Sequence, residues 1–220
     1  MSRERAVTGH MTRPSYPMMG IERLFVAVPI AEPAKRVATV ALATLRRADG
    51  LGAVRWVRPE SFHVTVAFVG DVRIDDVWVV STCVGQAARA IAIPPPLSLG
   101  PLRSIPSTSR PKVLWIDVLD QTGALGKVAD TTRLALGAAG FEIAAERFRP
   151  HVTLGRPRPN AGLMDLSLLA ARSNGPGWTP LTVDVWSSRT GEGGSTYSVV
   201  SRHPFGERGY AVPSPDPTVS

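Results

Sequence analysis

The sequence predicts an α+β fold made of two pseudo-symmetric lobes of antiparallel sheet and helices, which face each other across a central groove. Three observations indicate it. Strand-like and helical segments are interspersed, most connections between them are short, and one tetrapeptide pattern occurs once in each half of the chain. Short connections favour antiparallel pairing, because a parallel pair needs a long crossover. An Arg-Pro dipeptide precedes both tetrapeptides, as Arg58-Pro59 and Arg149-Pro150, which indicates a duplicated architecture.

Strands are expected where β-branched and aromatic residues cluster between prolines, glycines and charged residues. The first such run ends at Pro29. Gly191, Gly193 and Gly194 predict a hairpin turn rather than a phosphate-binding loop, since neither a Lys-Ser/Thr pair nor a helix follows them. The expected strands are 23–28, 54–57, 62–69, 97–105, 113–118, 150–156, 181–189 and 195–203.

Helices are expected where apolar residues recur at helical spacing. Asp75 fits the N-cap of the second helix, three prolines from Pro94 end it, and Gly140 closes the third. The expected helices are 33–47, 77–91, 122–139 and a short one at 163–171. The residues expected to face the core are Val37, Val40, Ala41 and Leu45 in the first, and Leu125, Val128, Ala129, Thr132 and Leu136 in the third.

The composition fits one domain with a substantial core. Of the 220 residues, 44% are hydrophobic and 20% are charged, which is typical of globular proteins. We expect a single bilobal domain at 21–205, between a flexible N-terminal arm at 1–20 and a flexible C-terminal tail at 206–220. The single cysteine, Cys83, excludes an internal disulfide framework, and its place in a helical pattern predicts a buried residue.

Charge and hydropathy narrow the partners and the location. The chain has 25 Lys and Arg against 18 Asp and Glu, a net charge of +7. This charge is equally consistent with an anionic partner such as nucleic acid and with a role in solubility alone. No apolar run approaches the roughly 18 residues of a membrane span, and the first twenty residues lack the apolar region of a secretory signal. We therefore expect a cytoplasmic protein, and a monomer, since no heptad or long apolar stripe is present.

The repeated tetrapeptide is His-apolar-Thr-apolar, present as His63-Val64-Thr65-Val66 and as His151-Val152-Thr153-Leu154. In a strand, residues i and i+2 share a face, so each copy places an imidazole beside a hydroxyl while the apolar residues turn to the core. Two such strands facing each other would form a pocket with two histidines, two threonines and no carboxylate. These groups suit acid–base chemistry on a phosphate ester.

Two other interpretations of the motifs exist. Either copy alone is better explained as a strand with a hydrogen-bonded histidine and a β-favouring threonine, although the occurrence of two copies disfavours this explanation. A two-histidine metal site is the second alternative. Zinc usually takes three or four protein ligands, and neither strand supplies a cysteine or carboxylate in step with its histidine. We therefore predict no metal here.

Five longer strings resemble the 2H phosphoesterase superfamily, and within it the RNA 2′,3′-cyclic phosphodiesterases, also called 2′-5′ RNA ligases. They occur in the order typical of the family, and the resemblance covers residues 21 to 202. Gly155 departs from it, since alanine is more usual there, and the N-terminal arm is longer than is typical. The strings are 23–27, 54–60, 63–70, 113–115 and 148–156.

The resemblance implies a bilobal 2H phosphoesterase fold with one motif strand in each lobe. It also implies metal-independent and cofactor-independent opening of an RNA 2′,3′-cyclic phosphate end to a 2′-phosphate, with reversible 2′-5′ joining of RNA ends. By position, His63 and His151 match the catalytic residues, and Thr65, Thr153 and Arg156 match residues that bind substrate. The resemblance implies His151 as base and His63 as acid, whereas the sequence itself leaves their order open.

Two further functions stay open. The same fold could act on a small cyclic nucleotide or on 2′-5′ oligoadenylate. It could also be a non-catalytic RNA-binding module, although the four intact motif residues speak against this. Phe68 and Trp115 could stack a nucleobase, but core packing explains them more simply. Arg110 and Lys112 could contact an RNA backbone, and His203 is expected at the surface.

Overall fold

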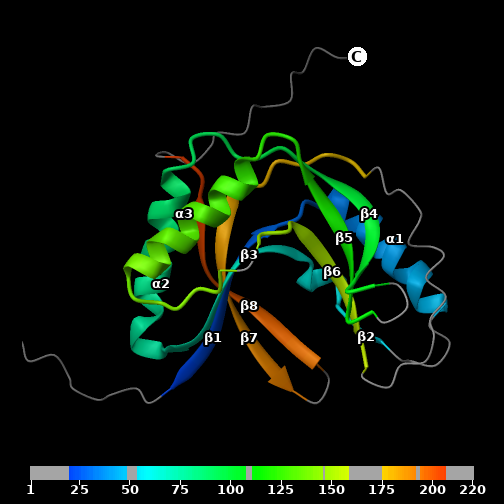
Figure 1. Cartoon of the computed structure of the whole chain (residues 1–220), viewed down its shortest axis with the longest axis horizontal. Coiled ribbons are helices and arrows are strands. Elements are labelled where there is room, and N and C mark those ends of the chain that lie inside the picture. Colours follow the sequence, from blue (N-terminus) through cyan, green and yellow to red (C-terminus); the bar gives the residue numbers. More distant parts are fainter. Residues whose placement is uncertain are drawn as a thin grey trace, which may run out of the picture.

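Eight strands form one curled antiparallel sheet, accompanied by three α-helices, in the part of the chain that the structure describes (Figure 1). The predicted α+β class is therefore confirmed. The structure is a computed structural model, and it describes residues 20–48, 54–107, 111–145, 147–158, 175–191 and 194–206. The strands are β1 (Ile21–Pro29), β2 (Val54–Trp56), β3 (His63–Arg73), β4 (Leu97–Ile105), β5 (Val113–Asp120), β6 (His151–Pro157), β7 (Thr182–Gly191) and β8 (Gly194–Pro204). The helices are α1 (Glu32–Ala48), α2 (Val77–Arg89) and α3 (Ala124–Ala138), with the short 3-10 helices η1 (Pro59–Ser61) and η2 (Ile74–Asp76).

The two motif strands, β3 and β6, join the two halves of the sheet. Neighbouring strands follow the order β4–β5–β6–β3–β1–β7–β8, and β2 pairs with the end of β6. One residue pair, Val64 with Val152, links β3 to β6. In Figure 1, α1 lies beside β4, β5 and β6, whereas α2 and α3 lie beside the other half. The two predicted antiparallel lobes are thus halves of one continuous sheet.

Strand β1 carries apolar residues on both of its faces. Leu24 and Val26 belong to the main core, which also contains buried apolar residues from all three helices. Phe25 and Ala27 lie on the opposite face, in a smaller cluster with Trp186 of β7. Because both faces are covered, the strand reads as a continuous apolar run instead of an alternating one.

Helix α1 matches the predicted helix to within one residue at each end, and three of its four expected core residues, Val37, Ala41 and Leu45, pack against the core. Val40 was expected to face the core and is 67% exposed. The buried face consists of Ala34, Ala38, Leu42 and Leu45. Two of these four are alanines, whose weak hydropathy gives the sequence pattern little signal, whereas the exposed valine is strongly apolar.

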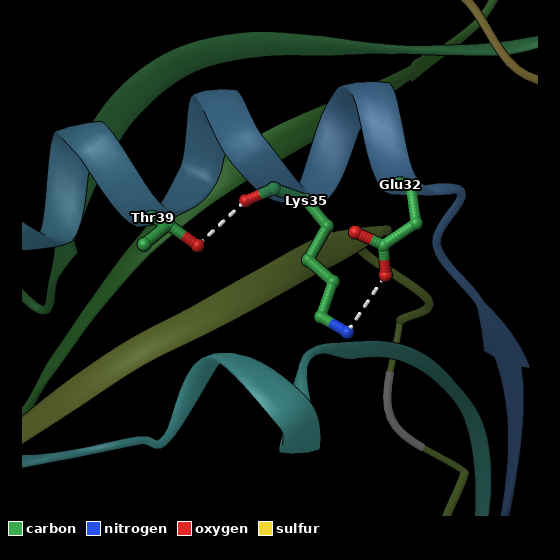
Figure 2. Close-up of polar contacts among 3 residues, drawn as sticks. All are labelled: Glu32, Lys35 and Thr39. Atoms are coloured by element: carbon green, nitrogen blue, oxygen red, sulfur yellow. Dashed lines mark hydrogen bonds and ion pairs between the residues drawn. The ribbon is translucent and has the colours of Figure 1, made fainter.

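Local polar contacts support the first turns of α1 (Figure 2). Nζ of Lys35 lies 3.0 Å from Oε1 of Glu32, a pair at i and i+3 on one face of the helix. Oγ1 of Thr39 donates to the carbonyl oxygen of Lys35 over 2.8 Å. The threonine hydroxyl is therefore satisfied within the helix and does not compete with its packing.

Helix α3 confirms the predicted inward face, since all five expected residues are buried. Its end is set by Gly140, which has a φ of 92°. The amide of Phe141 donates to the carbonyl of Leu136 over 3.1 Å, and the amide of Gly140 donates to that of Gly137 over 3.0 Å. These two bonds form a Schellman motif, which favours glycine in the left-handed conformation.

Helix α2 begins at Val77, as predicted, but it ends at Arg89, two residues before the predicted end, and its N-cap residue differs. Asp75 lies inside η2, and Asp76 occupies the N-cap position without a side-chain capping bond. The carboxylate of Asp75 instead lies 3.6 Å from the guanidinium of Arg73. Cys83 is buried in α2, as predicted. None of the helices in the described ranges has the length and apolar character needed to cross a membrane.

Some expectations fall on residues outside the described ranges. They concern the short helix at 163–171, Arg110, and the arm and tail apart from Gly20 and Gly206. The hairpin predicted near the C-terminus is confirmed, since β7 pairs with β8 up to Gly191 and Gly194.

Candidate active site

The two motif histidines are held in the same way. His63 begins β3 and His151 begins β6. Nδ1 of His63 lies 2.7 Å from the carbonyl oxygen of Ser61, and Nδ1 of His151 lies 2.7 Å from that of Arg149. Because a carbonyl oxygen only accepts, Nδ1 must carry the hydrogen and donate it. Nε2 of each ring is therefore the atom left to take up or release a proton.

The motif strands bring both His–Thr pairs to one place. Val64 lies opposite Val152, and both are fully buried. Continuing that antiparallel register places the histidine of each motif beside the threonine of the other. A cavity of about 340 Å³ lies between the two halves of the sheet, and it is lined by all five residues singled out from the sequence: His63, Thr65, His151, Thr153 and Arg156.

A β-bulge directly follows the threonine in each motif strand. The extra residue is Val66 in β3 and Leu154 in β6. Each bulge shifts the alternation of side chains by one position. The residue three positions after the threonine would otherwise turn into the core, and it faces the cavity instead. That residue is Phe68 in β3 and Arg156 in β6, so the two motifs present an aromatic ring and a guanidinium at equivalent places.

Gly155, beside the second bulge, allows β2 to approach β6 closely. A Cβ at this position would lie 2.7 Å from Cγ1 of Val54 and 2.8 Å from Cε3 of Trp56. Such contacts would push β2 away from its partner. In this chain, glycine is therefore required by the packing of β2 on β6.

Each motif histidine packs against an aromatic ring of a neighbouring strand. The ring centroids of His63 and Phe25 are 4.8 Å apart, and those of His151 and Trp115 are 4.5 Å apart. Trp115 is fixed in turn, because its Nε1 donates to Oδ1 of Asp117 over 2.7 Å. An arginine of β4 donates to the other carboxylate oxygen. These contacts hold both imidazoles in defined orientations.

Burial lowers the pKa of both imidazoles. The pKa of His63 falls from 6.5 to about 4, mainly through burial and further through the neighbouring His151, against the raising effect of its bond to the Ser61 carbonyl. Burial also lowers the pKa of His151. The Arg156 guanidinium lowers the pKa of His151 further, whereas the bond to the Arg149 carbonyl and the Asp117 carboxylate raise it. Without a bound anion, both rings are therefore neutral at pH 7, and a phosphate anion beside them would raise both pKa values.

The threonine hydroxyls are available to a ligand. Thr65 and Thr153 are half-buried in the cavity wall, and neither hydroxyl is hydrogen-bonded to another residue of the described ranges. With the Arg156 guanidinium, they provide donors for the non-bridging oxygens of a phosphate. In the described part of the chain, no group of three or more His, Cys, Asp and Glu side chains is placed to hold a metal ion.

Several other expectations can be compared with the structure. The prediction that Trp115 packs in the core is confirmed, since Trp115 is 6% exposed. The same prediction is wrong for Phe68, which is 64% exposed at the cavity. Lys112 is exposed but does not line the cavity. Sequence reasoning missed Phe25 and Asp117. Asp117 could have been found, since it shares a strand face with Trp115, whereas no local signal distinguishes Phe25.

The prediction that His203 lies at the surface is wrong. It is half-buried between β8 and α2, where its Nε2 lies 2.9 Å from Oγ of Ser201 and 3.3 Å from Oγ of Ser81. Gly85 makes room for the ring, because a Cβ there would lie 2.9 Å from Nδ1. His203 does not line the cavity, which makes it a useful control residue.

The chain is similar to several known proteins. The family model for LigT-like phosphoesterases matches residues 28–115. Over 137 residues, the chain is 31% identical to the RNA 2′,3′-cyclic phosphodiesterase of Thermotoga maritima, covering 61% of this chain and 69% of that protein. Over 104 residues, it is 31% identical to the protein of the same name from Aeropyrum pernix, covering 47% of this chain and 57% of that protein. The crystal structure of a Thermus thermophilus protein, TT0787, has a TM-score of 0.68 at 21% identity, covering 84% of this chain and 100% of that one.

The fold and the site together give the structural class of this protein: a curled antiparallel sheet in which two adjacent strands each carry a His–Thr pair at one cavity. The chain belongs to the LigT-like phosphoesterase family of the 2H phosphoesterases, as its motifs predicted. The match spans less than two thirds of the Aeropyrum pernix relative, at 57%. The likeness to TT0787 concerns the fold alone.

Proposed function

We propose that this protein is an RNA 2′,3′-cyclic phosphodiesterase that opens the cyclic phosphate to a 2′-phosphate by paired-histidine acid–base catalysis. One observation carries the proposal: two imidazoles, each anchored through Nδ1, line one cavity with an arginine and two hydroxyls that have no partner among the described residues. The relatives from Thermotoga maritima and Aeropyrum pernix bear this name, which supports the same activity here.

The reaction needs two proton transfers and a stabilised phosphate. One imidazole takes a proton from water as the water oxygen attacks phosphorus. The bond from phosphorus to O3′ breaks, and the other imidazole gives its proton to O3′. Thr65, Thr153 and Arg156 donate to the oxygens on which negative charge accumulates. If a ribose 5′-hydroxyl replaces water, the same steps join two RNA ends through a 2′-5′ linkage.

We assign the base to His63 and the acid to His151. A base must be neutral before the reaction, and the pKa of His63, at about 4, keeps it so. Burial lowers the pKa of His151 as well, but the bond to the Arg149 carbonyl and the Asp117 carboxylate oppose this, so His151 holds a proton more readily than His63 does. This order is the reverse of the one that the resemblance implies.

The kcat/KM of the enzyme should be greatest on the acid side of pH 6.5. Catalysis needs one neutral and one protonated ring, and burial lowers both pKa values below 6.5, that of His63 to about 4. The singly protonated pair is most abundant between the two values, so kcat/KM falls as the pH rises past the higher one. A bound phosphate raises both pKa values, so the profile of kcat should be displaced to higher pH. Initial rates across the pH range test this, and a kcat/KM optimum above neutrality would contradict it.

The activity is tested with a short RNA that ends in a 2′,3′-cyclic phosphate, incubated with the enzyme in excess EDTA. We expect a 2′-phosphate product, distinguished from a 3′-phosphate by nuclease digestion and chromatography. Loss of activity in EDTA with recovery on adding zinc would overturn the metal-independent mechanism. Tight RNA binding without turnover would instead identify a non-catalytic RNA-binding module.

A further inference from the structure

A second cavity, of about 550 Å³, adjoins the catalytic one. The two cavities share Val57, Ser61, Arg156 and Tyr197 in their walls. The remaining wall of the second cavity comes from β2, from Arg58 just after β2, from Arg158 just after β6, and from the β7–β8 hairpin. A ligand bound at the motif histidines can therefore extend into it past Arg156.

The second cavity is strongly basic. Among the described residues, its lining contains Arg55, Arg58, Arg156, Arg158 and Arg189 and no carboxylate. Arg189 is paired with a glutamate of β1 at 2.9 Å. Over the described ranges, the other four arginines have no carboxylate within ion-pair distance. Their charge is therefore left for a ligand to neutralise.

Two of these arginines face each other directly. Arg55 of β2 is the register partner of Arg156 of β6. Directly opposite residues of an antiparallel pair have Cβ atoms about 5 Å apart, and like charges at such positions are destabilising. An anion between the two guanidinium groups turns this repulsion into attraction. Arg158 follows directly after the end of β6 at Pro157, and it also lines this cavity.

We propose that this arginine cavity binds the backbone phosphates on the 5′ side of the cyclic phosphate, so that the enzyme prefers oligonucleotide ends to cyclic mononucleotides. The inference rests on the proposed function. A 2′,3′-cyclic phosphate ends its chain, so every further phosphate lies on its 5′ side. Guanidinium groups bind phosphodiester oxygens in a bidentate manner, and Arg156 lies between the two cavities to link the terminal phosphate with the next one.

The test compares adenosine 2′,3′-cyclic phosphate with a dinucleotide and a pentanucleotide that end in the same group. For the wild type, kcat/KM should rise with each added phosphate. The triple variant Arg55→Gln, Arg58→Gln, Arg158→Gln should lose this rise while its kcat/KM on the mononucleotide is unchanged. The loss of three contacts to a single strand should also make the variant less sensitive to salt. Raising the salt concentration from about 50 to about 200 mM should lower kcat/KM on the pentanucleotide about 20-fold more for the wild type than for the variant.

A matched control removes the same charge elsewhere. Arg36, Arg46 and Arg47 are exposed on α1 and do not line the cavity. The triple glutamine variant at these positions should keep the length dependence of the wild type. Equal loss in both triple variants would show general electrostatic attraction and overturn the proposal, as would a wild type that is indifferent to length. Failure to hydrolyse any of the three substrates would instead overturn the proposed function.

Discussion

Replacing either motif histidine by alanine should lower kcat on RNA with a cyclic phosphate end by roughly 10²–10⁴-fold, the usual contribution of a positioned acid or base. The reason is that Nε2 is the free nitrogen of each ring, whereas Nδ1 is engaged with a backbone carbonyl. His63→Ala and His151→Ala are measured by single-turnover hydrolysis, with thermal unfolding to show that the fold persists. A double variant that retains the wild-type rate would refute the site.

The matched control is His203→Ala. Like the motif histidines, His203 is half-buried, but it is hydrogen-bonded through Nε2 and lies on β8 outside the cavity. The variant should therefore keep the wild-type kcat, even if its unfolding temperature changes. Equal loss of activity in all three variants would indicate damage to the fold and not to the chemistry.

The same variants distinguish the acid from the base. In a substrate with sulfur in place of O3′, the leaving thiolate needs no proton, since a thiol has a pKa of about 8.5. This substrate should restore turnover to the variant that lacks the acid. We expect rescue of His151→Ala and none of His63→Ala, and the opposite pattern would restore the order that the resemblance implies.

The sequence alone could place the histidines and threonines on one strand face, because the two-residue period of a strand is a local property. It could not place Arg156 by the same rule. Counted from Thr153 by regular alternation, Arg156 would point into the core. The bulge at Leu154 reverses this, and a bulge depends on how the strand pairs with β5, which no local pattern encodes. Arg156 was identified only through the family resemblance.

The helices show the same division. The inward face of the third helix was predicted correctly, because large apolar residues mark that face and Gly140 marks the end of the helix. In the first helix, Val40 was wrongly expected in the core, because the buried face includes alanines of weak hydropathy and the exposed valine is more strongly apolar. His203 was misplaced since its pocket depends on Gly85, 118 positions away in sequence by their residue numbers. A weak local signal therefore accounts for the error in the first helix, and a contact between distant segments accounts for the error at His203.

Replacing Thr65 or Thr153 by valine should lower kcat by about 10²–10³-fold, or about 2.7–4 kcal/mol, as for other donors to a developing oxyanion. Both hydroxyls lie in the cavity wall without a hydrogen-bonding partner in the described part of the chain. Valine keeps the shape and the strand preference of threonine, so the fold should be retained. Single-turnover rates of the two variants and of their double variant measure the effect. If both hydroxyls serve the same phosphate, the combined loss should differ from the sum of the two free energies.

Thr132→Val is the control for this substitution. Its hydroxyl is fully buried in α3 with no partner among the described residues, so its removal should leave kcat unchanged and the unfolding temperature equal or higher. The separation of kcat from KM then decides what the motif threonines do. A donor that acts on the charge of the transition state lowers kcat with little change in KM, whereas one that only holds the substrate raises KM at constant kcat. We expect the first pattern, because the phosphate oxygens gain charge as water attacks, and the second would reduce both threonines to binding residues.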